Sequence, residues 1–160
     1  MMGTCNTKCE ISKMEIHKGG LNTAEIYARW HDEIKDKNLG AFIVFSGIIR
    51  DDDSVTGLSF DIHEPMLKAW FDEWVKRAGA EGAKVLMAHS VGDVFVGESS
   101  YLAAVVSKQR KVALRLINEY VEDFKANAPI WKYDLKDGKR IYAKERSALI
   151  EGAGLLKDDK

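Results

Sequence analysis

Hydrophobic and polar residues alternate along the chain with two different periods, which predicts strands interspersed with helices. Residues 39–50 (LGAFIVFSGIIR) form a continuous apolar run rich in β-branched and aromatic side chains, a pattern typical of a buried central strand. A charged loop separates this run from residues 58–64 (LSFDIHE), which we expect to pair back onto it as a hairpin. Further strands are predicted at 9–17, in two or three pieces of 83–108 with Gly92 and Gly97 at the turns, and in a hairpin of 130–145 that turns at Asp137-Gly138.

Apolar residues recur at helical spacing in the segments between these strands. A first helix is expected over residues 21–38, where Asn22 can cap the N-terminus. A second helix is expected over 65–82, because Pro65 suits a first helical turn. A short helix is predicted at 145–156.

The longest predicted helix covers residues 110–128. It should end there because Pro129 disfavours a helical conformation in the residue before it. The residues expected on its apolar face are Val112, Leu114, Leu116, Ile117, Tyr120, Val121 and Phe124.

The order of these elements indicates the α+β fold class, with a mixed or antiparallel sheet and helices packed on it. A chain of 160 residues is long enough to bury one sizeable core, and it contains no internal repeat and no linker. We therefore expect a single domain over residues 1–160, with 1–10 and 153–160 as flexible ends.

Composition narrows the classes of function. The formal net charge is −1, so the molecule as a whole does not attract nucleic acid or an anionic membrane. No apolar run approaches the roughly 18 residues of a membrane span, and the start of the sequence lacks the apolar region of a secretory signal. We expect a cytoplasmic protein in which any bound anion is held by a local group of basic residues.

Metal and histidine chemistry have little support in the sequence. Cys5 and Cys9 could bind a metal together with His17, but four ligands are the norm, so a plain thiol pair is favoured. His89 follows an apolar strand and is interpreted as a structural or turn residue. We expect neither a metal nor a cofactor.

The placement of basic residues is more informative than their number. Lys125 lies in the last turn of the predicted long helix and Lys132 at the start of the next strand, with Pro129 and Trp131 between them. Either lysine alone has an ordinary explanation, because the helix dipole favours a cation at a helix C-terminus and strand ends are usually solvated. Together they suggest one fixed corner that carries two amines. Arg50, at the end of the long apolar run, emerges from the core in the same way.

A second basic group, around Arg110, begins the long helix, where free N–H groups favour a bound anion. Arg110 and Lys125 are fifteen residues apart on this helix, which is roughly 22 Å at 1.5 Å per residue. They cannot hold one small ligand from the same chain. If both serve one site, Arg110 must come from a neighbouring subunit, and the protein must be a dimer.

Four stretches resemble the large, catalytic subunit of molybdopterin synthase, the MoaE family. They are GAFIVFSGIIR, VGDVFVGESSYLAAVVSKQR, NEYVEDFKANAPIWKYD and DGKRIYAKERS, in this order between Leu39 and Ser147. The helix followed by Lys-x-x-x-Pro-x-Trp-Lys is the most specific part.

The resemblance implies an α/β-hammerhead-type fold and a sulfurtransferase. The family makes the molybdopterin dithiolene, in molybdenum cofactor biosynthesis, from cyclic pyranopterin monophosphate (precursor Z). Sulfur arrives as a thiocarboxylate on the C-terminal Gly-Gly tail of a MoaD-type ubiquitin-like small subunit. Two large subunits form a central dimer within a heterotetramer. Neither nucleic acid nor a membrane is implied as a partner.

The resemblance also assigns residues. Lys125 and Lys132 match the family's catalytic lysines, Arg50 an arginine of the substrate site and Phe45 an aromatic that lines the pocket. Arg110 matches an arginine supplied across the dimer.

At two positions the match to the family is not exact. Gln109 stands where the family commonly has histidine, and glutamine cannot carry a proton at neutral pH. Either Lys144 or Arg146 matches a further basic residue of the family.

Two other classes of function stay open on the sequence alone. One is a non-catalytic dimeric module that docks a ubiquitin-like tail, which the glutamine at position 109 keeps open. The other is a small dimer that binds nucleic acid, which the neutral net charge and the absence of a nucleic-acid motif disfavour.

Overall fold

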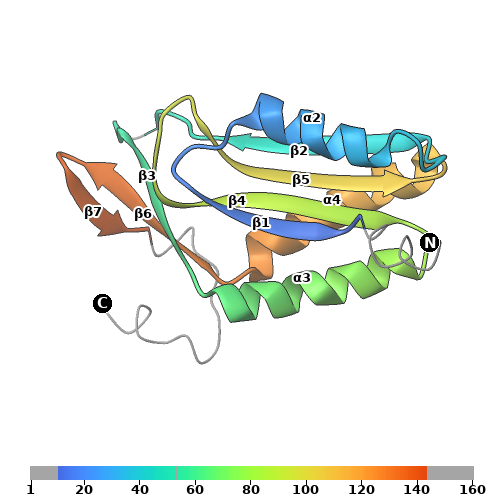
Figure 1. Cartoon of the computed structure of the whole chain (residues 1–160). Coiled ribbons are helices and arrows are strands. Elements are labelled where there is room, and N and C mark those ends of the chain that lie inside the picture. Colours follow the sequence, from blue (N-terminus) through green and yellow to red (C-terminus); the bar gives the residue numbers. More distant parts are fainter. Residues whose placement is uncertain (1–10, 53, 144–160) are drawn as a thin grey trace.

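The computed structural model describes residues 11–52 and 54–143, and Figure 1 shows how their helices and strands are arranged. The strands are β1 (Lys13–Lys18), β2 (Ala41–Ile48), β3 (Gly57–Ile62), β4 (Lys84–Phe95), β5 (Ser99–Ser107), β6 (Ile130–Lys136) and β7 (Lys139–Tyr142). The helices are α2 (Thr23–Ile34), α3 (Glu64–Gly79) and α4 (Arg110–Asn127). The expected flexible ends and the helix predicted at 145–156 lie outside the described residues.

The long strand β4 organises the sheet by changing partners halfway along its length. Residues 84–89 pair antiparallel with β5, and β1 pairs with β4 in parallel. Residues 92–95 pair antiparallel with β3, which in turn pairs with β6, and β6 with β7. The path through the sheet is β2-β5-β4-β3-β6-β7. This mixed sheet with packed helices confirms the α+β prediction.

Two glycines have the backbone conformations that this path requires. Gly97 lies in the turn between β4 and β5 with φ of 90°, as the sequence predicts. Gly92 also has a positive φ, of 85°, but it lies inside β4 rather than in a turn. It stands where β4 passes from one set of partners to the other. The predicted turn is therefore a bend within one continuous strand.

The apolar run at 39–50 forms β2, and the prediction of a central strand is wrong. β2 pairs only with β5 among the described strands, whereas β5 is buried along its whole length and lies inside the sheet. The first half of the run is apolar because both faces of β2 are covered there, whereas the second half of the strand is largely exposed. Phe42 and Val44 pack toward α2, and Ala41 and Ile43 pack toward α4 and the larger core.

The predicted hairpin between residues 39–50 and 58–64 is also wrong. β3 pairs with β4 and β6, not with β2. By contrast, the predicted β6–β7 hairpin is confirmed, since Asp137 and Gly138 form its turn with φ of 51° and 75°.

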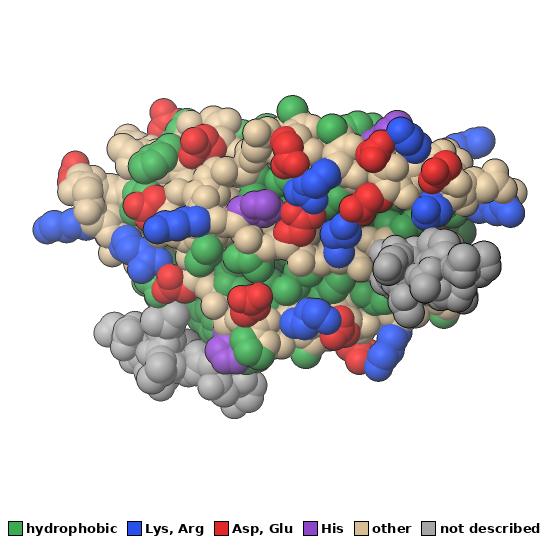
Figure 2. Space-filling model, in the orientation of Figure 1, with side chains coloured by type: hydrophobic (Ala, Val, Ile, Leu, Met, Phe, Trp, Pro, Cys, Tyr) green, Lys and Arg blue, Asp and Glu red, His purple; other side chains and the backbone are tan. Residues whose placement is uncertain are grey.

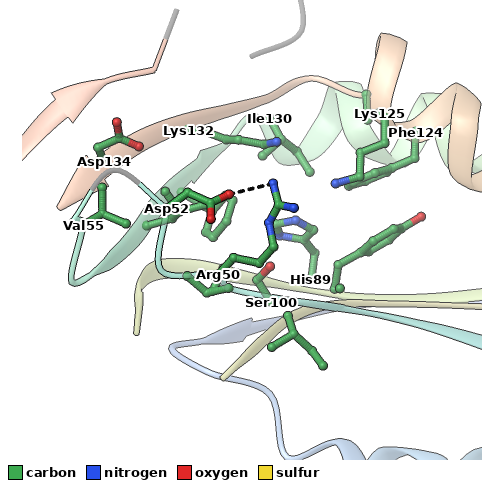
Figure 3. Close-up of a pocket in the computed structure, with 17 residues that line it drawn as sticks. Arg50, Asp52, Val55, His89, Ser100, Phe124, Lys125, Ile130, Lys132 and Asp134 are labelled. Carbon is green, nitrogen blue, oxygen red and sulfur yellow. Dashed lines mark ion pairs between the residues drawn. The ribbon is translucent and has the colours of Figure 1, made fainter. Parts of the chain in front are cut away.

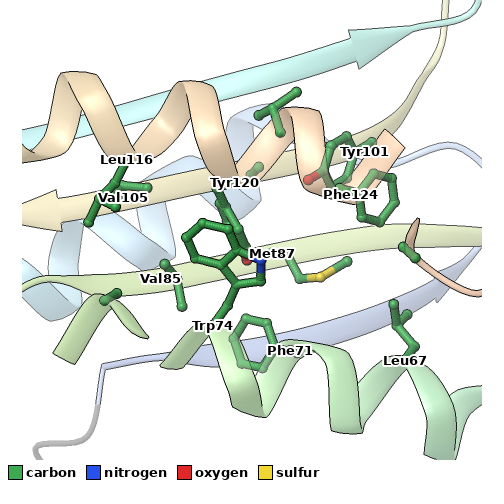
Figure 4. Packing of buried hydrophobic residues seen from close by; sticks show 14 of the residues in the cluster. Leu67, Phe71, Trp74, Val85, Met87, Tyr101, Val105, Leu116, Tyr120 and Phe124 are labelled. Carbon is green, nitrogen blue, oxygen red and sulfur yellow. The ribbon is translucent and has the colours of Figure 1, made fainter. Parts of the chain in front are cut away.

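The core has two layers because alternate residues of β4 and β5 face opposite sides of the sheet. One side packs against α2 through Ile26, Trp30 and Ile34. The other side packs against α3 and α4 and forms the larger cluster (Figure 4). The predicted apolar face of α4 holds except at Leu114, which is 55% exposed, while Ala113 beside it is buried.

Two carboxylates tie the helices to the rest of the molecule. Asp123 on α4 accepts hydrogen bonds at Oδ2 from the indole N–H groups of Trp70 (2.9 Å) and Trp74 (2.7 Å) of α3. On the other side of the sheet, Glu15 of β1 accepts hydrogen bonds from Arg29 and Trp30 of α2. These contacts fix the positions of α3 and α2.

Candidate active site

A cavity of about 410 Å³ opens where the C-terminal end of α4 meets the twisted part of the sheet. Its walls come from the end of β2, from β3, β4 and β5, from the last turn of α4 and from β6. Figure 3 shows the side chains of Arg50, Lys125 and Lys132 directed into the space between these elements. Residues more than 80 positions apart in the sequence thus meet at one site.

The corner after α4 places the two lysines. The Ala128 N–H donates to the Phe124 carbonyl (3.1 Å), and the chain then turns through Pro129 into β6. Lys125 is in the last turn of the helix, and Lys132 pairs with Phe60 of β3, which also lines the cavity. Trp131 is buried. The sequence prediction of one fixed corner with two amines agrees with this geometry.

Arg50 reaches the cavity from the opposite side, just after β2 ends. Its side chain is 81% exposed and makes an ion pair of 2.9 Å with Asp52 (Figure 3). Asp134 of β6 lines the cavity as well. The site therefore contains three cations and two carboxylates, and an entering anion would compete with Asp52 for the guanidinium of Arg50.

The ammonium of Lys125 has a lowered pKa. Desolvation by burial is the largest cause, the positive charge of Arg50 adds to it, and Glu122 acts in the opposite direction. The residue as a whole is exposed, so the desolvation reflects the concave surroundings of its amine rather than a buried stem. A lysine with a lowered pKa exchanges protons more readily near neutral pH.

His89 lines the cavity, a role that the sequence pattern does not predict for it. It is buried in β4, as the structural interpretation expected, but it also lines the cavity. Burial lowers its pKa to about 4, assisted by the charges of Lys132 and Lys125, while a hydrogen bond to Ser90 opposes the shift. The alternation of side chains along β4 could have indicated this position, because it places His89 on the same face of the strand as Val85 and Met87.

Other predicted site residues lie elsewhere in this chain. Phe45, 37% exposed on β2, does not belong to the cavity lining, but its ring and that of Tyr101, which does line the cavity, meet edge to face at a centroid distance of 6.0 Å. Gln109 and Arg110 are exposed at the opposite end of α4 from Lys125. Within one described chain, nothing brings them to the cavity. Lys144 and Arg146 lie outside the described residues.

The described residues contain no group of three or more His, Cys, Asp or Glu side chains placed to hold a metal ion. His17, one proposed ligand, instead forms a hydrogen bond with Glu15 (2.9 Å), and Cys5 and Cys9 lie outside the described part of the chain.

No helix in the described ranges is both long and apolar enough to span a membrane. On the face in Figure 2, acidic and basic side chains are interspersed, without the single-sign stripe typical of a nucleic-acid surface.

Comparison with known proteins identifies the family. The model of the family described as MoaE protein matches residues 17–127. A molybdopterin synthase catalytic subunit of Helicobacter pylori is 52% identical over 143 residues, covering 89% of this chain and 99% of that protein. A Dictyostelium discoideum protein of the same name is 32% identical and covers 64% of this chain and 70% of its own length.

Solved structures agree with this result. The complex of subunits 1 and 2 of the molybdopterin-converting factor from Helicobacter pylori 26695 contains a chain with a TM-score of 0.83 and 52% identity, covering 89% of this chain and 98% of that one. A MoaE protein of Burkholderia ambifaria has a TM-score of 0.68 at 21% identity, covers 91% of this chain and 97% of its own, and supports the fold alone. The family model, the identity to curated relatives and the shared fold together place this chain in the MoaE family.

Proposed function

We propose that this chain is the catalytic subunit of a molybdopterin synthase, a cytoplasmic sulfurtransferase. It would move sulfur from the C-terminal thiocarboxylate of a small ubiquitin-like subunit to cyclic pyranopterin monophosphate. The observation that carries the proposal is the meeting of Arg50, Lys125 and Lys132 at one cavity. The name of the Helicobacter relative and its structure in a two-subunit complex support the activity and the partner.

The charges of the cavity suit two anionic reactants. A thiocarboxylate tail and a phosphate-bearing pterin repel each other, so their approach requires local positive charge. Arg50 stays protonated and offers a fork of donors that fits a phosphate. Lys132, from the neighbouring strand β6, adds a second charge that holds the substrate and stabilises negative charge as it develops.

Lys125 is assigned the proton chemistry. Once the tail's sulfur is bonded to the pterin, water adds to the acyl carbon of the resulting thioester and places negative charge on the carbonyl oxygen of the terminal glycine, where an ammonium stabilises it. The bond between sulfur and the acyl carbon then breaks, which leaves sulfur on the pterin and a carboxylate on the tail. The lowered pKa of Lys125 also allows its amine to give up or take a proton during the transfer.

The complete site requires a second copy of the chain. Arg110 lies at the far end of α4 from Lys125, so its match to a substrate-binding residue makes sense only if a neighbouring large subunit supplies it. Gln109 would arrive with it and could donate or accept a hydrogen bond. We therefore propose a dimer of large subunits with one small subunit at each end, and no metal or cofactor of its own.

The second candidate function is a dimeric docking module that binds the ubiquitin-like tail without chemistry. Gln109 in place of the family histidine favours it, because an acid–base group is lost there. The presence of Lys125 with a lowered pKa in the cavity argues for the enzyme.

A single-turnover assay separates the two functions. The chain is mixed with a thiocarboxylated MoaD-type partner and precursor Z, and the dithiolene product is measured. We expect product at a yield limited by the thiocarboxylate. A stable complex with the partner that yields no product would support the docking module instead.

A further inference from the structure

His89 lies at the base of the cavity and lines it, although the residue as a whole is only 2% exposed. Three aromatic rings surround it: Phe60 at 5.0 Å, Phe124 at 5.4 Å and Tyr101 at 5.6 Å between centroids. In Figure 3 the imidazole rises from the sheet toward the space that Arg50 and Lys125 face. These contacts hold the ring in one orientation.

A backbone hydrogen bond fixes the tautomer of this ring. Nδ1 lies 2.7 Å from the carbonyl oxygen of Ser90. A carbonyl only accepts, so Nδ1 carries the proton and Nε2 keeps a free lone pair in the neutral ring. Burial and the two lysines keep the ring neutral by lowering its pKa to about 4. In the described part of the chain, no residue donates a hydrogen bond to Nε2.

The other polar groups of the cavity leave a need for a hydrogen-bond acceptor, which the Nε2 lone pair can supply. Arg50, Lys125 and Lys132 are donors only, which suits a phosphate but not the N–H groups of a pterin ring. Of the two carboxylates, Asp52 pairs with Arg50 at 2.9 Å, and Asp134 lies at the opposite end of the cavity from Lys125 (Figure 3). Packing alone does not require histidine at this position, because a phenylalanine ring would fill the same space. What histidine adds is Nε2, an acceptor in the neutral ring.

We propose that His89 is a substrate-positioning residue whose Nε2 accepts a hydrogen bond from a ring N–H or the exocyclic amine of the bound reduced pterin. The cations hold the phosphate of the same molecule, so the two interactions together set the orientation of the pterin in the cavity. This assignment rests on the proposed function, because it takes a phosphorylated pterin as the ligand.

Equilibrium binding to the dimer tests the assignment with three variants of one residue. His89→Phe keeps a ring among Phe60, Tyr101 and Phe124 but removes the acceptor, and it should weaken precursor Z binding roughly tenfold. His89→Gln places an amide oxygen near the position of Nε2 and should recover most of that loss. His89→Asn keeps a donor for the Ser90 carbonyl without reaching the Nε2 position, and it should behave like His89→Phe. Inorganic phosphate should bind all four proteins within about twofold of one another.

Nitrogen NMR of the histidine rings tests the assignment in the unaltered protein. We expect an Nδ1–H tautomer for His89 at neutral pH and a shift of the Nε2 resonance on adding precursor Z but not inorganic phosphate. A protonated Nε2 in the free protein, or equal precursor Z affinity in His89→Phe and the wild type, would overturn the assignment. If the wild type binds and converts precursor Z but His89→Phe does so equally well, only this assignment fails. If the wild type binds phosphate but not the pterin, the proposed function fails with it.

Discussion

Arg50 and Lys125 face each other across one cavity, and the guanidinium lowers the pKa of the amine. Arg50 follows an edge strand, whereas Lys125 lies in the last turn of a helix, 75 residues later in the sequence. An arginine is never deprotonated under these conditions, so its charge acts on the lysine at every working pH. The relationship pairs a permanent cation with an amine that can exchange protons.

The two charged neighbours of Lys125 should shift its titration in opposite directions. Arg50→Gln removes a positive charge and should raise the pKa of Lys125, while Glu122→Gln removes a negative charge and should lower it. Both shifts should be larger at low salt, because these groups are exposed to solvent. The measurement is the pH dependence of Lys125 acetylation, followed by mass spectrometry.

An internal control comes from Lys76, which lies in the last turn of α3 and does not line the cavity. Its labelling should not differ between the two variants and the wild type. Shifts of the same sign in both variants would contradict the electrostatic account of Lys125.

Sequence alone could predict the elements, the corner and the β6–β7 hairpin, but not how the other strands pair. Caps and breakers act locally, so Asn22, Pro129 and the Asp137-Gly138 turn were interpreted correctly. The position of β2 at the edge could not be predicted, because an apolar run looks the same whether strands flank it or helices cover it. The position of His89 in the cavity could not be predicted for a similar reason, because the sequence does not show which buried residues line a cavity.

The Glu15 carboxylate should make stability depend on acid pH. Desolvation raises its pKa, but hydrogen bonds from Arg29, Trp30 and His17 outweigh this effect and lower it to about 2. A depressed pKa stabilises the fold above the unfolded value near 4.5, and this stabilisation is lost as the pH falls through about 2. Glu15→Gln should therefore lower the free energy of unfolding at pH 7 by about 2 kcal/mol, allowing for solvent screening of Arg29.

Urea denaturation of Glu15→Gln and the wild type at pH 7, 5 and 3 checks this prediction. The difference should shrink as the pH falls. Glu33→Gln, which removes a partly exposed ion pair with Lys13, is the control and should cost under about 1 kcal/mol. A difference for Glu15→Gln that stays constant over this range would contradict the account.

The Asp123 carboxylate should be important for the packing of α3 on α4. Asp123→Ala leaves the indole N–H groups of Trp70 and Trp74 without their acceptor and should cost about 2–4 kcal/mol in the free energy of unfolding. Asp72→Ala, which removes an exposed partner of Lys68 on α3, should cost under about 1 kcal/mol. Equal effects of the two substitutions in urea denaturation would show that the indole contacts contribute little.

Mixing inactive variants tests the proposed dimeric site. Arg110→Ala and Lys125→Ala should each be inactive alone. If Arg110 acts across the dimer, a mixed dimer contains one site with both residues intact, so random mixing should restore about a quarter of wild-type activity.

The control for this experiment mixes Lys125→Ala with Lys132→Ala. Both lysines line the cavity of one chain, so no mixed site is intact and no activity should return. Failure of the Arg110→Ala and Lys125→Ala mixture to recover, despite exchange of subunits, would exclude a site shared between subunits.

The most direct measurement is single-turnover sulfur transfer by Lys125→Ala, with the thiocarboxylated partner and precursor Z, beside Lys76→Ala as a matched lysine variant in the last turn of α3, outside the cavity lining. We expect Lys76→Ala to form the dithiolene like the wild type, and Lys125→Ala to bind the partner but form no product. Full product formation by a folded, dimeric Lys125→Ala would contradict the assignment of the chemistry to this lysine.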